Sequence, residues 1–181
     1  MAFVGGKQKG GWVIVVSIVL AFVLGIIPLP DWLEVWRPEW VALVLIYWVI
    51  ALPHRIGLIT AWIIGIAMDV LDGSLLGLNA IALIFITYIA LNLYQRMRMF
   101  TPLQQCLTIL MLIGSQQLLI FWVQTATSQN TPQNLMFVVS SISSALLWPL
   151  VFVLLRYWRR SLRVRWWLVL LVARPTSLLG G

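Results

Sequence analysis

The stretch Gly65-Ile-Ala-Met-Asp69-Val-Leu-Asp72-Gly73-Ser-Leu-Leu-Gly77 places two of the five acidic residues of a 181-residue chain in a long apolar region. On a helix, Gly65, Asp69 and Asp72 fall at positions i, i+4 and i+7, which lie on one face. An ionised carboxylate at membrane depth costs about 2.5–3.5 kcal/mol on insertion scales, so it faces protein or a cavity rather than lipid. Gly73 and Gly77 allow the helix to end or another backbone segment to come close. We therefore expect the rest of the chain to fold around this segment.

The composition is that of an integral membrane protein. The chain is 62% hydrophobic and 9% charged, with a mean hydropathy of +1.00, whereas soluble domains carry about 25% charged residues. We therefore expect one all-α membrane domain. The formal net charge of +7 fits basic residues that orient membrane spans better than nucleic-acid binding, because no soluble basic fold accompanies it. The single cysteine, Cys106, cannot form an internal disulfide.

Six apolar runs predict six transmembrane helices. The predicted spans are residues 12–27, 40–52, 56–71, 75–93, 103–123 and 135–155, within a membrane domain of residues 1–160. The second span is short, since its residues make about 20 Å of helix against a hydrocarbon core of about 30 Å. Short spans surround sites near the midplane in some transporters, but flanking residues that snorkel or a locally thinned bilayer give the same pattern. Both explanations stay open.

The basic residues predict the orientation of these spans. With the N-terminus in the cytoplasm, Arg37 is the one residue among twelve lysines and arginines that falls in an outside connection. The same outside connections hold Asp31, Glu34 and Glu39. This bias follows the positive-inside rule and predicts both termini in the cytoplasm. The predicted cytoplasmic rim comprises His54, Arg55, Arg96, Arg98, Arg156, Arg159 and Arg160.

The C-terminal tail, residues 161–181, combines arginines with a short apolar run. Residues 166–173 are too few to span a bilayer. We expect the tail to be disordered or to form an interfacial helix on anionic lipid of the inner leaflet.

Residues that could carry out catalysis or bind a metal are scarce. His54, the only histidine, lies in a short predicted turn, and no cluster of histidine, cysteine and carboxylate has metal-ligand spacing. No P-loop, G-x-S-x-G or G-x-G-x-x-G motif is present. Asp69 and Asp72 come from one helix, whereas an aspartic dyad takes its acids from different elements. We therefore expect no enzymatic activity, no catalytic residue, no metal and no cofactor.

The two acids have three interpretations. In the first, Asp69 accepts hydrogen bonds from neighbouring segments and Asp72 caps the outer turn. In the second, they line a polar pocket for a small ligand or partner, and in the third they lie on a proton or ion path. The candidate polar site comprises Gly65, Asp69, Asp72, Gly73, Gly77 and Asn79.

A serine cluster marks the last predicted span. Ser140 and Ser144 share a helix face, and small residues at this spacing let helices approach closely. Packing within the bundle explains them, and so does a groove for the single transmembrane helix of a partner. The candidate partner-helix surface comprises Ser140, Ser141, Ser144 and Trp148.

Several motifs together resemble one family. They are Arg37-Pro38-Glu39-Trp40, Tyr47-Trp48, Leu52-Pro53-His54-Arg55, Gly65…Asp69…Asp72-Gly73…Leu76-Gly77 and Leu147-Trp148-Pro149. Their order and spacing, from about Trp12 to Arg160, resemble the bacterial rod shape-determining protein MreD of the proteobacterial type. The tail after about Leu162 looks longer than is usual for that family.

The resemblance implies a non-enzymatic component of the elongation machinery (the Rod complex) in the bacterial inner membrane. It implies MreC as a direct partner, through its transmembrane helix, and links to MreB, RodZ, and RodA with its transpeptidase. It also implies a fold similar to the substrate-binding S components of energy-coupling factor transporters. The alternative function is that of a small-ligand-binding transporter subunit, which rests on the short spans and on Asp69 and Asp72.

Overall fold

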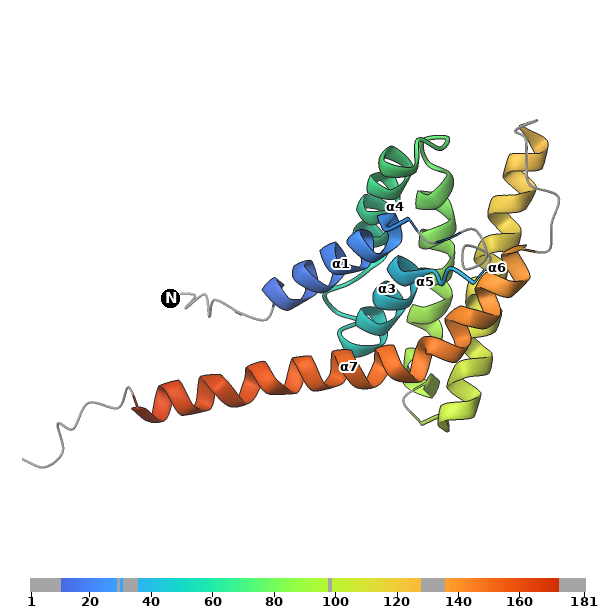
Figure 1. The fold of residues 1–181 in the computed structure, drawn as a ribbon. Coiled ribbons are helices and arrows are strands. Elements are labelled where there is room, and N and C mark those ends of the chain that lie inside the picture. Colours follow the sequence, from blue (N-terminus) through green and yellow to red (C-terminus); the bar gives the residue numbers. More distant parts are fainter. Residues whose placement is uncertain (1–10, 29, 31–35, 98, 128–135, 173–181) are drawn as a thin grey trace, which may run out of the picture.

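The computed structural model describes residues 11–28, 30, 36–97, 99–127 and 136–172, and within its last helix the side chains of residues 138–158. The described chain is helical and contains no strand. Figure 1 shows its six helices, α1 (Gly11–Ile26), α3 (Trp40–Ala51), α4 (Leu58–Asp72), α5 (Leu78–Met97), α6 (Pro102–Ala126) and α7 (Met136–Val172). The all-α prediction is therefore confirmed, and each predicted span coincides with a helix. The sixth continues to residue 172 instead of ending at 155.

Three helices have the length and composition to cross a membrane. They are α5, α6 and the part of α7 from Val138 to Trp158. Helices α1 and α3 are apolar but shorter, with 16 and 12 residues. At about 1.5 Å per residue, α3 is about 18 Å long, well short of a hydrocarbon core of about 30 Å.

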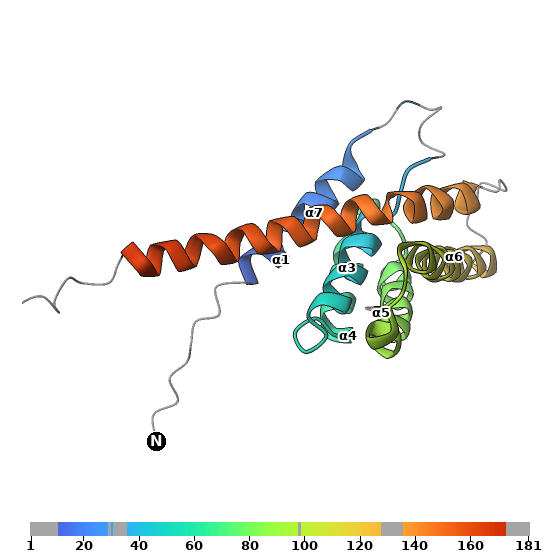
Figure 2. The same ribbon diagram turned by 90° about the horizontal axis from the view of Figure 1, so that it is seen from below.

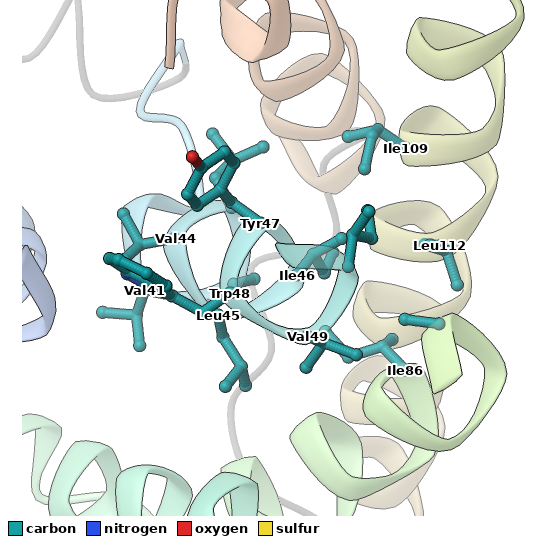
Figure 3. Close-up of a cluster of buried hydrophobic side chains, with 14 of the residues drawn as sticks. Val41, Val44, Leu45, Ile46, Tyr47, Trp48, Val49, Ile86, Ile109 and Leu112 are labelled. Atoms are coloured by element: carbon teal, nitrogen blue, oxygen red, sulfur yellow. The ribbon is translucent and has the colours of Figure 1, made fainter. Parts of the chain in front are cut away.

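Helix α3 lies at the centre of the bundle. It packs against α1, α5 and α7, and every side chain from Val41 to Ile50 is buried. A helix that is apolar on all sides is one that protein encloses. Figure 3 shows its side chains meeting Ile86 of α5 and Ile109 and Leu112 of α6. An enclosed helix does not have to match the thickness of the lipid, which gives the short span a packing explanation.

Polar and aromatic contacts fix α3 to two of its neighbours. The Trp48 Nε1–H donates to Ser17 Oγ of α1 at 2.7 Å, and Ser17 Oγ donates to the Ile14 carbonyl at 2.8 Å. The Tyr47 ring meets the Phe152 ring of α7 edge-on, with centroids 5.7 Å apart. A buried indole N–H needs an acceptor, so Ser17 sets where α1 can sit on α3.

Helices α4 and α5 form a tight antiparallel pair. The contact is closest at Gly65, where an added Cβ would overlap the Cα and N atoms of Ala80. The lack of a side chain at residue 65 therefore sets the distance between these helices. On the helix face that it shares with Asp69, Gly65 therefore allows α4 to pack closely against α5.

Helix α7 is 37 residues long, or about 55 Å. Figures 1 and 2 both show its C-terminal part extending beyond the other helices, and Figure 1 shows a bend part-way along it. Pro149 lies inside this helix. Proline lacks the backbone N–H and its ring crowds the carbonyl four residues earlier, which is a common cause of helix bending.

We predict that Gly65→Ala destabilises the protein by about 1–3 kcal/mol, because the new methyl forces α4 away from α5. Gly114→Ala is the matched control, since a Cβ there meets nothing within 4 Å and alanine is the better helix former. Thermal unfolding in detergent, followed by tryptophan fluorescence, measures both. Equal midpoints for the two variants would contradict the close contact at Gly65.

Candidate functional site

The Asp69 carboxylate is the most densely hydrogen-bonded acidic group among the described residues. Its side chain is 1% exposed. Oδ1 accepts from Ser74 Oγ at 3.0 Å and from the Asn79 backbone N–H at 2.9 Å, while Oδ2 accepts from the Gly77 N–H at 2.8 Å. Hydrogen bonds to an ionised acceptor are the strong ones, and they offset the cost of burying its charge. Asp69 therefore holds the α4–α5 turn together from within.

The backbone of this turn is built to reach that carboxylate. Gly73 ends α4 with a φ of 63°, and its N–H donates to the Asp69 carbonyl. The Ser74 N–H donates to the same carbonyl at 3.1 Å. Gly77 has a φ of 100°, which only glycine adopts without strain, and this conformation presents its N–H to Oδ2. The glycines expected to end the helix thus also supply donors.

The structure separates the two acids of the candidate polar site. Asp69 is buried, whereas Asp72 is exposed at the last residue of α4. Asn79 is buried, and its backbone N–H contacts Asp69. Asp69, Gly77 and Asn79 are therefore joined by hydrogen bonds across the α4–α5 turn, and Gly65 packs against Ala80 further along the same helix pair. This geometry supports the interpretation that Asp69 is a structural acceptor.

A second polar cluster joins the segment before α3 to α6 and α7. Ser140 Oγ donates to the Arg37 carbonyl at 2.7 Å, and the Glu39 N–H donates to Ser144 Oγ at 2.9 Å. Gln117 Nε2 donates to Glu39 Oε1 at 2.7 Å and lies 3.4 Å from Ser140 Oγ. We call these residues, 37, 39, 117, 140 and 144, the Glu39 cluster. It fixes the position at which α3 enters the bundle.

Electrostatics link the Glu39 cluster to the α4–α5 turn. Partial burial raises the pKa of Glu39, and the nearby Asp72 carboxylate raises it further. The Arg37 guanidinium and the hydrogen bond from Gln117 oppose this rise. Both polar clusters therefore lie at the same end of the bundle.

The serines and the tryptophan predicted to pack against a partner helix lie inside this chain. Ser141, Ser144 and Trp148 are buried, and Ser140 is partly buried. Trp148 Nε1 donates to Gln105 Oε1 at 3.3 Å, and Gln105 Nε2 in turn donates to the Met97 carbonyl at 3.0 Å. These contacts support the packing interpretation. The partner-helix groove stays a prediction, with these side chains committed to intramolecular contacts.

The predicted rim residues lie at the opposite end of the bundle where the structure describes them. His54 and Arg55 are exposed in the turn before α4, and Arg96 is exposed in the last turn of α5. Arg156 is exposed on α7, sixteen residues or about 24 Å after Ser140. Arg98 lies outside the described residues, as do the side chains of Arg159 and Arg160.

Sequence reasoning missed the partnership of Glu39 and Gln117. The sequence places Glu39 in a predicted outside connection and in the motif Arg37-Pro38-Glu39-Trp40, and Gln117 is one of several polar residues inside apolar runs. Nothing in their separation of 78 positions could reveal the contact. No group of three or more histidine, cysteine or acidic residues in the described part of the chain could hold a metal ion.

Comparison with known proteins places this arrangement in a family. The model of the family "rod shape-determining protein MreD" matches residues 7–158. The chain belongs to the MreD family. The Rod shape-determining protein MreD of Haemophilus influenzae is 32% identical over 154 residues, which cover 84% of this chain and 94% of the relative. No solved structure matches the chain.

The family assignment confirms the resemblance drawn from the motifs and makes this a membrane protein of the rod-shape system. MreD is a shape-determining structural family that is not known as an enzyme. The matched region ends at residue 158, so the tail predicted at residues 161–181 lies beyond it. The part of α7 after Trp158 is therefore an extension relative to the family pattern.

We predict that Asp69→Asn lowers the stability of the protein by about 1–3 kcal/mol. The amide NH₂ of asparagine is a donor, and it would face one of the groups that now donate a hydrogen bond to the carboxylate. Ser74→Ala removes a single neutral donor and should cost about 1 kcal/mol. Asp72→Asn is the control for charge, since it removes the same charge from an exposed position on the same helix. The thermal midpoint in detergent should be highest for Asp72→Asn, lower for Ser74→Ala and lowest for Asp69→Asn. The assignment fails if the Asp69 and Asp72 variants are equally stable.

We predict that Glu39→Gln flattens the pH dependence of stability. The folded pKa of Glu39 lies above its ordinary value of 4.5, so the folded state binds more protons than the unfolded state between these two values. Stability therefore falls as pH rises through that window. Glutamine keeps an oxygen for Gln117 but does not titrate. Thermal midpoints measured from pH 4 to pH 8 should fall less for this variant than for the wild type, and equal slopes would contradict the assignment.

Proposed function

We propose that this protein is a non-enzymatic, six-span subunit of the Rod complex in the bacterial inner membrane, where it binds MreC and supports lateral peptidoglycan synthesis. The family match over residues 7–158 carries this proposal. The contacts of the polar residues support it, because Asp69 and the Glu39 cluster form hydrogen bonds with other residues of the same chain. The side chains of Asp69 and of the Glu39 cluster are therefore not free for a reaction or for a small ligand.

The charge distribution supports an orientation with both termini in the cytoplasm. The end of the bundle with Asp69, Asp72 and Glu39 would face outward, and the end with Arg55, Arg96 and Arg156 would face inward. Basic residues collect on the cytoplasmic side of membrane proteins. This rim would meet anionic lipid and the side of the complex occupied by MreB, with RodZ, RodA and its transpeptidase as further members.

All six helices can belong to such a domain, although α1, α3 and α4 are shorter than a helix that crosses the membrane alone. Helix α3 is enclosed by α1, α5 and α7, so the bundle rather than the lipid solvates it. Helix α4 packs along α5, which is itself long enough to span. A short helix shielded in this way can complete a spanning bundle without a hydrophobic length of 30 Å.

The direct test is retention of MreC. We predict that the tagged chain, solubilised in mild detergent, retains MreC, and that Asp72→Asn retains as much as the wild type. Asp69→Asn should retain less, in proportion to the loss of folded protein measured by size-exclusion chromatography. If the folded wild-type chain retains no MreC, the proposed function is wrong.

Shape provides a second readout in cells. In a strain that lacks the native protein, Asp72→Asn should restore rod shape fully, because Asp72 is exposed and its side chain makes no hydrogen bond in the described part of the chain. A loss of shape with Asp72→Asn at normal abundance would instead favour a role for a free outer carboxylate. Immunoblotting of membrane fractions and measurement of cell width separate these outcomes.

A further inference from the structure

One narrow face of α5 carries polar groups where lipid would cover them. The exposed residues of this helix before Arg96 are Ile81, Phe85, Tyr88, Asn92 and Gln95. The rest of α5 packs against α3, α4 and α6. We call these five residues the α5 seam.

Two polar members of the seam lie well inside the hydrocarbon core. Helix α5 has 20 residues and qualifies as a membrane span, so its length of about 30 Å matches the core. Tyr88 then lies about 1 Å from the middle of the helix and Asn92 about 7 Å from it, by the rise of 1.5 Å per residue. Tyr88 is 58% exposed, so much of this residue faces lipid near the midplane.

Asn92 cannot reach the nearer membrane surface. Side chains on a helix lean toward its N-terminus, which for α5 is the far end of the span. The hydrogen bond shows this lean directly, since Asn92 Nδ2 donates to the Tyr88 carbonyl at 3.0 Å, one turn back. That bond uses one amide hydrogen. Among the described residues no hydrogen bond reaches Asn92 Oδ1 or the Tyr88 hydroxyl.

Uncovered polar groups in hydrocarbon favour association between helices, because a partner can supply the missing hydrogen bonds. The seam also has the spacing of such a contact. Its members follow one another at intervals of four, three, four and three residues, the repeat of a left-handed helix pair. Asparagine at a single seam position is known to specify pairing in that geometry.

We propose that the α5 seam is a homodimer interface in which Asn92 of one copy pairs with Asn92 of the other. Two-fold symmetry explains why a second copy of this chain fits the seam. In a dimer whose two-fold axis is normal to the membrane, the same residue of both copies lies at the same depth. A carboxamide both donates and accepts, so two Asn92 side chains at equal depth satisfy each other. A different partner would need its own polar group at that depth.

Cross-linking of the purified full-length chain in lipid nanodiscs tests the contact. In a Cys106→Ser background, Asn92→Cys should give a disulfide-linked dimer on oxidation with copper phenanthroline. Leu107→Cys is the depth-matched control, because Leu107 is exposed on α6 five residues from its first residue, as Asn92 is five residues from the last of α5. It should remain monomeric. Equal cross-linking at the two positions, or none at residue 92, overturns the proposal.

The strength of association gives an independent readout. Asn92→Leu should weaken dimerisation in lipid bilayers by about 3- to 30-fold, measured by energy transfer between labelled copies, whereas Asn92→Gln should stay within about threefold. An unchanged dissociation constant for Asn92→Leu overturns the pairing. Cross-linking in cells adds one further outcome, since an adduct of Asn92→Cys with another protein in place of the dimer overturns self-association. The purified assay contains no MreC, so its result is independent of the proposed function.

Discussion

The structure depends on one constraint, that the buried Asp69 carboxylate and the non-helical backbone just before α3 find their hydrogen-bond partners within the chain. The Asp69 carboxylate shows how this is met. It accepts from one side chain and two backbone N–H groups, and it thereby decides the course of residues 73–79. Gly65 lets the two helices joined by this turn touch. The closed turn, the short interhelical distance and the burial of Asp69 therefore require one another.

The same constraint organises the opposite side of this end of the bundle. Residues 36–39, just before α3, are not helical, and their backbone groups would be costly to leave unpaired in a low-dielectric environment. Ser140 and Ser144 of α7 bind two of them, and Gln117 of α6 binds the Glu39 side chain. The polar side chains of the Glu39 cluster thus close the fold at the start of α3.

Much of the fold could be predicted from sequence because its signals are local. Apolar runs bounded by proline and charge gave the six helices, and the spacing of Gly65 and Asp69 gave their shared face. The role of α3 could not be predicted, because burial on all sides depends on which helices surround it. Within the candidate site, the link from Asp69 to Gly77 is close in sequence and could be anticipated, whereas the link from Glu39 to Gln117 joins distant segments with no pattern between them. The sequence predicted either a separate interfacial helix or disorder for residues 161–181, and one helix continuous with the sixth span could not be foreseen because the arginines interrupt the apolar run, although arginine favours helix as much as leucine does.

Helix α7 has a mechanical consequence. One uninterrupted helix joins Ser140, which holds the Arg37 carbonyl, to residue 172, far outside the bundle. Helical backbone resists stretching, so a load applied to the projecting arm is delivered to the Glu39 cluster about 50 Å away along the axis. Pro149, in between, is the point at which such a load would be taken up as bending. Helix α7 thus connects its projecting C-terminal part to the start of α3, and Pro149 is the point where this connection can bend.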